Sequence, residues 1–211
     1  MSDRTGTVLV YLKYPEPGRV KTRLAATIGF DAAAELYRGW IGLVLGRLQS
    51  LRPDVSIIGA IDGAGPQAFA TWGELVDGWW QQPDGDLGAR LDAGFKFAHA
   101  DRPVLAIGTD CLEIEPHAIR EAFGLLRGHD AVFGPTGDGG YYLVGTALYL
   151  KGFFDGIRWS TPNTLRDHFL RCHECDWRAE LLPALNDIDT WEDWVAYCRR
   201  NGVEIARPSP P

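Results

Sequence analysis

Short apolar segments, rich in β-branched residues, alternate along this chain with longer segments whose apolar residues recur at helical spacing. The first kind predicts buried strands and the second predicts amphipathic helices. Strands are expected at 7–13, 54–62, 102–110, 130–136 and 140–146, and helices at 31–48, 65–75, 85–100, 116–126, 161–172 and 189–201. Because strands that alternate with helices pair in parallel, and the last two strands flank a glycine-rich turn, the sequence predicts a single-domain three-layer α/β/α fold with a mostly parallel mixed sheet.

The chain offers no internal boundary. It has 211 residues, of which 45% are hydrophobic, and neither a linker nor a repeat divides it. We therefore expect one domain over residues 1–205. The proline-rich end, ARPSPP, cannot pack as regular structure, so a disordered tail is expected at 206–211.

Charge and hydropathy exclude several classes of protein. The formal net charge of -7 argues against a nucleic-acid partner, which requires a broad basic surface. No run of about 18 apolar residues is present, so no membrane span is expected, and MSDRTG lacks the apolar core of a secretory signal. The four cysteines fit a reducing, cytoplasmic location, and the CxxC of Cys172 and Cys175 lacks the second ligand pair of a zinc site. Eight tryptophans are compatible with an apolar homodimer surface.

The loop after the first strand is strongly basic. Ligands of open α/β sheets bind in the loops at the carboxyl ends of strands, and PEPGRVKTRL (15–24) is the first of these loops. With the residue that ends the strand, its cations are Lys13, Arg19, Lys21 and Arg23. Gly18 lets the backbone approach a ligand closely, so cations and backbone N–H groups together would cradle a polyphosphate. A solvated loop is the alternative, and a Walker A loop is excluded because Val20 stands before Lys21.

Acidic residues stand at two other positions of interest. Asp110 ends the third strand in GTDC (108–111), where a carboxylate either holds Mg²⁺ against a nucleotide diphosphate or caps a turn. In NDIDTWED (186–193), Asp187 and Asp189 are separated by one residue, and we expect only one of them to share a metal with Asp110. Asp189 also has the position of a helix N-cap, with Glu192 three residues later.

Two glycine-rich segments complete the set of candidate loops. GPTGDGGYYLVG (134–145) places Asp138 among glycines, which either let a sugar or base approach the backbone or simply form a β-turn. In QPDGDLGARL (82–91), Asp86 and Arg90 lie four residues apart at a helix entrance. They form either a cap with an ion pair or contacts to a nucleobase or sugar.

These segments together resemble a known family. LKYPEPGRVKTRL, GDLGARL, GTDC, GPTGDGGYYLVG, WST (159–161) and DIDTWED occur in an order and at intervals similar to those of small glycosyltransferase-A-like proteins. These are the radical-SAM/selenodomain-associated transferases of the nucleotide-diphospho-sugar transferase superfamily, and the resemblance spans about residues 7–195. A more distant resemblance is to nucleotidyltransferases of the same fold, such as molybdenum cofactor guanylyltransferase and the sugar-phosphate cytidylyltransferases. The resemblance implies a nucleotide-diphospho-sugar transferase fold for the domain.

The resemblance also implies roles for particular residues. It implies that the first loop, with Arg19, Lys21 and Arg23, binds the phosphates of the nucleotide. It assigns Mg²⁺ or Mn²⁺ to Asp110 and Asp189, the latter by its match to a cytidylyltransferase segment, with Asp187 as the alternative. Together with the loop positions described above, we expect nucleotide binding by Lys13, Gly18, Arg19, Lys21, Thr22, Arg23, Asp86, Arg90 and Thr109, and substrate binding by Asp138, Gly139, Gly140, Tyr141 and Thr161. The expected catalytic residues are Lys21, Asp110 and Asp138.

The family resemblance and the metal pattern favour different reactions. Thr109 occupies the first position of the DxD that glycosyltransferases of this fold use, and Leu112 stands where the related pattern has Pro. We first expect a metal-dependent glycosyltransferase that takes a nucleotide-diphospho-sugar donor and an unidentified small-molecule acceptor. The second expectation is a nucleotidyltransferase that joins a nucleoside triphosphate to a phosphorylated acceptor and releases pyrophosphate. A non-catalytic nucleotide-binding module is the third.

Overall fold

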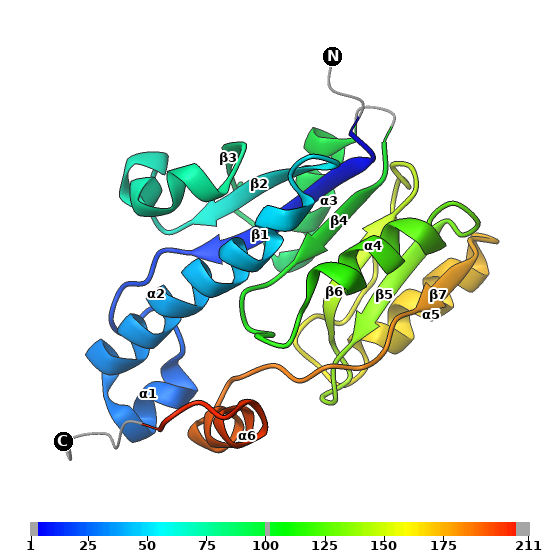
Figure 1. Cartoon of the computed structure of the whole chain (residues 1–211). Helices are drawn as coiled ribbons and strands as arrows, with labels where there is room; N and C mark the ends of the chain where they lie inside the picture. Colours follow the sequence, from blue (N-terminus) through cyan, green and yellow to red (C-terminus); the bar gives the residue numbers. More distant parts are fainter. Residues whose placement is uncertain (1–3, 100–101, 206–211) are drawn as a thin grey trace.

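One mixed sheet runs through the computed structural model, which describes residues 4–99 and 102–205 (Figure 1). Its seven strands have the order β3-β2-β1-β4-β6-β5-β7. β6 is antiparallel to both of its neighbours, whereas every other pair is parallel. The strands are Gly6–Lys13 (β1), Val55–Asp62 (β2), Gly78–Gln81 (β3), Val104–Ile107 (β4), Ala131–Pro135 (β5), Tyr141–Thr146 (β6) and Ala179–Leu181 (β7). The predicted mostly parallel, mixed sheet is confirmed.

Helices cover both faces of this sheet, with α2 and α4 on the near face in Figure 1. The α-helices are Thr22–Ile28 (α1), Phe30–Arg47 (α2), Leu87–Ala98 (α3), Pro116–Leu125 (α4), Thr164–Glu174 (α5) and Trp191–Asn201 (α6). Two 3₁₀ helices, Leu48–Leu51 (η1) and Pro66–Leu75 (η2), lie on either side of β2 in the sequence. The three-layer α/β/α arrangement is therefore confirmed.

The alternation of side chains along β1 explains the two layers. Val8 and Val10 pack into the core cluster that contains α1, α2 and α4, whereas Leu9 packs into the cluster that contains α3 and α5. All three are fully buried. A strand buried on both faces needs a continuous apolar run, which is the pattern that TVLVYL supplies.

The strand directions gather the candidate loops at one edge. β1, β2 and β4 are parallel, so the segments that follow Lys13, Asp62 and Ile107 leave the sheet on the same side. The turn between β5 and β6 lies on that side too, because β6 is antiparallel to β4. Four segments far apart in the sequence thus meet where ligands of this class of sheet bind.

Several local predictions need correction. Residues 65–75 form a 3₁₀ helix, and α1, β3 and β7 were not predicted, because each is short and has little periodicity. Thr190, not Asp189, caps α6, in a capping box with Asp193. Helix α2 begins at Phe30, directly after Gly29, one residue before the predicted start at 31. The predicted tail at 206–211 lies outside the described residues, as does residue 100 of the predicted third helix.

The turn between β5 and β6 supplies a stability prediction. Gly139 has φ 89°, and a Cβ there would overlap the backbone carbonyl of Pro162. Gly139→Ala is expected to lower the free energy of unfolding by about 2 kcal/mol, or the melting temperature by roughly 4–8 °C. Gly137→Ala is the control in the same turn, because its Cβ would meet nothing within 4 Å. Equal melting temperatures for the two variants would contradict the assigned turn geometry.

Candidate functional site

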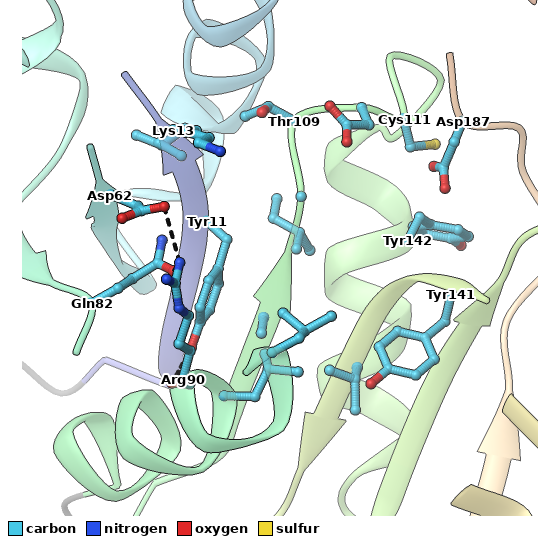
Figure 2. A pocket seen from close by; sticks show the side chains of 18 of the residues that line it. Tyr11, Lys13, Asp62, Gln82, Arg90, Thr109, Cys111, Tyr141, Tyr142 and Asp187 are labelled. Carbon is cyan, nitrogen blue, oxygen red and sulfur yellow. Dashed lines mark hydrogen bonds and ion pairs between the residues drawn. The ribbon is translucent and has the colours of Figure 1, made fainter. Parts of the chain in front are cut away.

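A cavity of about 410 Å³ opens at the carboxyl edge of the sheet, between the strands and the first turn of α3 (Figure 2). Its apolar lining includes Leu87, Leu91, Ala106 and Val144. Its polar lining comes from several separate strand ends and comprises Tyr11, Lys13, Tyr37, Asp62, Gln82, Arg90, Thr109, Asp110, Tyr141, Tyr142 and Asp187. A largely apolar cleft with a few convergent polar groups is the usual form of a small-molecule site.

A second hollow of about 260 Å³ lies beside the first and belongs to the basic loop. It is lined by Lys13, Arg19, Val20, Lys21, Thr22, Arg23, Tyr37, Asp110 and Asp189. The two hollows share Lys13, Tyr37 and Asp110. The loop cations and the strand-end carboxylate thus border one continuous region. Gly18, at φ 81°, holds the preceding turn in a conformation that favours glycine.

Lys21 is the one cation of this loop whose side chain is buried, at 6% exposure. Its Nζ donates to the carbonyl of Ile188 at 2.7 Å and contacts Asp110 Oδ1 at 2.8 Å and Asp189 Oδ1 at 3.3 Å. Its backbone is left-handed, with φ 46°, which is uncommon for a residue other than glycine. The structure therefore joins Lys21, Asp110 and Asp189, but as a closed ion-pair cluster.

Asp187 faces the larger cavity beside Cys111 and Tyr142 (Figure 2), and Asp110 lines the same cavity. Burial, and next the negative charge of Asp110, raise the pKa of Asp187 to about 7. Among residues 4–99 and 102–205, no side chain donates a hydrogen bond to Asp187. Asp189 is instead engaged by Lys21 and by Arg23, each at 3.3 Å. Asp187 therefore differs from Asp189 in making no ion pair among the described residues, although it lines the same cavity as Asp110.

The donor set beside Asp110 fits a hard divalent cation. Asp110 and Asp187 offer carboxylate oxygens, which Mg²⁺ and Mn²⁺ prefer, and an ion between them would relieve their mutual repulsion. The described part of the chain has no group of three or more His, Cys, Asp or Glu side chains that would hold a metal alone. A metal at this site would therefore need phosphate oxygens of a ligand, as Mg²⁺ usually does.

Arg90 has a different partner from the one that the sequence suggested. Its Nη1 donates to Asp62 Oδ2 at 2.9 Å, and its Nε donates to the Gly85 carbonyl (Figure 2). Asp86 caps α3 by accepting from the Ala89 N–H at 2.8 Å. Asp62 and Gln82 were missed as candidates, although Asp62 ends a predicted strand and so carried the same positional signal as Asp110.

Tyr37 is a third residue that was missed, and its hydroxyl contacts both Lys13 and Thr109. Its hydroxyl bonds to Thr109 Oγ1 at 2.9 Å and accepts from the Lys13 N–H at 3.2 Å. Burial raises the pKa of Tyr37 above its ordinary value, so the phenol stays neutral. Thr109, predicted to bind nucleotide, is buried and held by this contact. No sequence signal marks Tyr37, since it lies inside an amphipathic helix.

The turn after β5 is ordered by its own aspartate. Asp138 Oδ1 accepts from Thr136 Oγ1 at 2.6 Å and from the Gly140 N–H at 3.0 Å, which leaves Oδ2 free of hydrogen bonds within the described ranges. Tyr141 reaches the cavity, and its buried hydroxyl has no hydrogen-bond partner there. Thr161 caps a local turn through the Arg158 carbonyl and lines neither hollow.

Comparison with known proteins bears on the family and the fold of the chain. A family model described as an uncharacterized protein conserved in bacteria, DUF2064, matches residues 48–161. A crystal structure from Desulfovibrio desulfuricans G20, provisionally assigned as a nucleotide-diphospho-sugar transferase, is 30% identical. The match covers 94% of this chain and 88% of that one, with a TM-score of 0.83. The predicted resemblance to nucleotide-diphospho-sugar transferases is therefore confirmed.

Two more distant structures share the fold. The synthetase for CMP:2-keto-3-deoxy-manno-octonic acid, complexed with CTP, is 13% identical over 94% of this chain and 99% of its own, with a TM-score of 0.61. Rv0371c from Mycobacterium tuberculosis H37Rv, complexed with manganese, is 15% identical over 92% of this chain and 97% of its own, with a TM-score of 0.51. No curated protein matches the chain. None of the helices in the described residues has the length and apolarity needed to cross a membrane.

Proposed function

The chain belongs to the DUF2064 family of bacterial proteins, and on this premise we propose that it is a metal-dependent transferase that uses a nucleotide-activated donor. One observation carries the proposal: a cavity with loop cations on one side and the carboxylates of Asp110 and Asp187 on the other. Such a pairing suits a polyphosphate, which needs cations from the protein and a carboxylate-held metal. The structural relative from Desulfovibrio and the CTP-bound synthetase fold support this class of ligand.

The nucleotide lies, in this proposal, along the carboxyl edge of the sheet. Its phosphates contact the exposed cations Arg19 and Arg23 and the strand-end Lys13. The Asp62–Arg90 pair and Gln82 meet the nucleobase or ribose at the opposite end of the cavity. Asp86 acts through α3, whose first turn it caps, and does not touch the ligand.

The metal site consists of Asp110 and Asp187, which revises the expected pair of Asp110 and Asp189. Asp187 makes no ion pair of its own among the described residues, and burial and the charge of Asp110 raise its pKa to about 7 although Lys21 opposes the shift. Both carboxylate oxygens of Asp189 already contact cations, Oδ1 with Lys21 and Oδ2 with Arg23. Mg²⁺ or Mn²⁺ at this site would neutralise charge on the phosphates of the donor. The manganese complex of Rv0371c supports a divalent ion in this fold.

Glycosyl transfer is the reaction that we propose first. An acceptor hydroxyl attacks the anomeric carbon of the donor sugar, and the bond from that carbon to the phosphate oxygen breaks. The nucleoside diphosphate leaves with the electron pair. Asp138 holds a free Oδ2 toward which the acceptor proton passes, while its Oδ1 keeps the turn in place. Tyr141 lines the cavity and would meet the sugar, whereas Gly139 and Gly140 shape the turn that precedes it.

Nucleotidyl transfer is the second candidate, and one observation favours it. Thr109 is buried against Tyr37, so this strand end presents a single carboxylate rather than a DxD pair. In this reaction an acceptor phosphate oxygen attacks the α-phosphorus of a nucleoside triphosphate in line. The bond to the β-phosphate breaks, and pyrophosphate leaves. Two carboxylates from separate segments suit that geometry as well.

A ligand screen tests the proposal. UDP, GDP, CDP and ADP, with the corresponding triphosphates and nucleotide sugars, are expected to raise the melting temperature when Mn²⁺ or Mg²⁺ is present, because a ligand that binds only the folded state stabilises it by mass action. Release of nucleoside diphosphate from a nucleotide sugar identifies glycosyl transfer, and release of pyrophosphate identifies nucleotidyl transfer. If a nucleotide binds and neither product is released, the protein is the non-catalytic nucleotide-binding module of the third expectation. Absence of any metal-dependent shift contradicts the proposal.

Other properties stay as the sequence predicts them. Within the proposal we keep the cytoplasmic location that the four cysteines suggest, and we keep the absence of a nucleic-acid partner because the net charge is -7. The identity of the small-molecule acceptor is open to the same screen. A homodimer also remains a prediction, to be measured by light scattering.

A further inference from the structure

Three oxygen atoms surround the ammonium group of Lys21. The Ile188 carbonyl lies 2.7 Å from Nζ, Asp110 Oδ1 lies at 2.8 Å and Asp189 Oδ1 lies at 3.3 Å. An ammonium group has three N–H donors, so each donor already has an acceptor. The side chain is 6% exposed, and Nζ also lies 5.3 Å from the centre of the Trp40 ring. Lys21 has no donor left for a phosphate in this arrangement.

The arrangement resembles the coordination of a cation more than a phosphate-binding lysine. Its ligands are two carboxylates and a carbonyl, which are the oxygen types that hard cations bind. Asp110 follows β4, whereas Ile188 and Asp189 precede α6, so the two segments lie more than 75 residues apart in the sequence. The backbone of Lys21 is left-handed, at φ 46° and ψ 44°, and its buried side chain contrasts with the exposed side chains of Arg19 and Arg23 in the same loop.

We propose that Lys21 is a positioning residue that acts through Asp110 as a resident cation. Its ammonium group neutralises Asp110 and Asp189 in the free protein, so that Mn²⁺ or Mg²⁺ binds well only when it arrives with the phosphates of a nucleotide. Metal binding is thereby tied to nucleotide binding. This inference rests on the metal site of the proposed function, but it assigns to Lys21 a role other than direct contact with phosphate.

Arg23 provides a matched comparison for this role. It also pairs with Asp189, at 3.3 Å, and carries the same charge, yet its side chain is 70% exposed. It makes no contact with Asp110 among the described residues. Solvent screens the charge of an exposed group strongly, whereas a buried charge acts at close to full strength. Removing Lys21 or Arg23 therefore changes the net charge equally but changes the field at Asp110 very differently.

Titration of Mn²⁺ alone, followed by electron paramagnetic resonance, tests the inference. Lys21→Met is expected to bind Mn²⁺ at least about tenfold more tightly than the unaltered protein without nucleotide, because it frees carboxylate oxygens and removes a competing cation. Arg23→Met is expected to change this affinity by less than about threefold, as befits an exposed charge. If Lys21 had only a structural role, the Lys21→Met variant would not bind Mn²⁺ more tightly than the unaltered protein.

A second variant protects the test against loss of the fold. Lys21→Gln keeps hydrogen-bond donors for Asp110 and the Ile188 carbonyl but carries no charge, so the same tightening of Mn²⁺ binding is expected. Unchanged or weaker Mn²⁺ binding in folded Lys21→Met or Lys21→Gln overturns the inference. So does an equal gain in Arg23→Met. If neither Lys21 variant folds with or without Mn²⁺, Lys21 is a structural residue and the inference is wrong.

Parallel titrations with nucleotide separate this inference from the proposed function. In the unaltered protein, CDP, GDP, UDP or ADP is expected to tighten Mn²⁺ binding, and the Lys21 variants are expected to lose most of that dependence. If none of these nucleotides affects Mn²⁺ binding while Lys21→Met still tightens it, the proposed function and the coupling to nucleotide both fail, and only the competition of Lys21 with metal stands. If a nucleotide tightens Mn²⁺ binding in the unaltered protein but the variants behave identically, the function stands and the resident cation fails.

Discussion

Replacing Asp110 with alanine is expected to lower the affinity for a metal–nucleotide complex by at least about 100-fold and to abolish transfer, since the metal then has one protein carboxylate instead of two. The fold should survive, because Asp110 is 46% exposed and Lys21 keeps its contacts with Asp189 and the Ile188 carbonyl. Calorimetry with Mn²⁺ and the best nucleotide of the screen measures the first effect. Thermal unfolding measures the second.

Two further variants show whether the loss belongs to the proposed metal site. Asp187→Asn is expected to reproduce most of the defect, because Asp187 faces the cavity beside Asp110. Asp189→Asn is the matched control, two residues further along the chain. It is expected to have a smaller effect on metal affinity because Asp189 is paired with Lys21 and Arg23. If Asp189→Asn weakened metal binding more than Asp187→Asn does, Asp189 rather than Asp187 would be the second metal ligand. If Asp110→Ala left the affinity for the metal–nucleotide complex unchanged, the proposed metal site would be wrong.

Acid is expected to destabilise the protein through His168, which lines neither hollow of the candidate site. This side chain is fully buried among Phe133, Phe153 and Trp159, and neither ring nitrogen makes a hydrogen bond of normal geometry in the described structure. Burial lowers the pKa of His168 from 6.5 to about 3, with nearby Asp167 and the backbone of Phe153 opposing the shift only in part. The imidazole is therefore neutral in the folded state at any pH near neutrality.

The sign of the effect follows from proton binding. Between pH 6.5 and about 3 the unfolded chain carries a proton on His168 and the folded chain does not, so stability falls as the pH falls through this window. One pKa unit corresponds to about 1.4 kcal/mol, so His168 should remove about 3 kcal/mol of unfolding free energy between pH 7 and pH 4. Urea unfolding at a series of pH values measures this loss.

A matched pair of variants isolates the contribution of His168. His168→Met keeps the volume nearly constant and removes no hydrogen bond, so it should be close to neutral at pH 7 and should flatten the acid limb of the stability curve. His173→Gln, at an exposed position on the same helix, should leave that limb unchanged. If the acid limb of His168→Met matched that of the unaltered protein, another group would be responsible.

Much of the fold could be read from the sequence because its signals are local. Val8, Val10 and Leu9 define a strand buried on both faces before any partner is known, and glycine at 139 marks a turn with positive φ. The position of Asp110 at a strand end, and of the basic loop after the first strand, follows from the same reasoning. Short elements such as α1, β3 and β7 escaped, since their few residues gain most of their stability from neighbours rather than from periodicity.

The sequence by itself determined which residues carry charge and at which edge of the sheet their loops emerge. Only the tertiary structure decided which of them meet. Asp187 and Asp189 lie two residues apart, a spacing that does not by itself choose between them. The choice depended on how the segment docks, with the Ile188 N–H donating to the Asp110 carbonyl and Ile188 itself buried. The burial of Lys21 and the pairing of Arg90 with Asp62 were decided in the same way. Contacts between residues distant in the chain arise from packing and desolvation, and neither quantity has a local signature in the sequence.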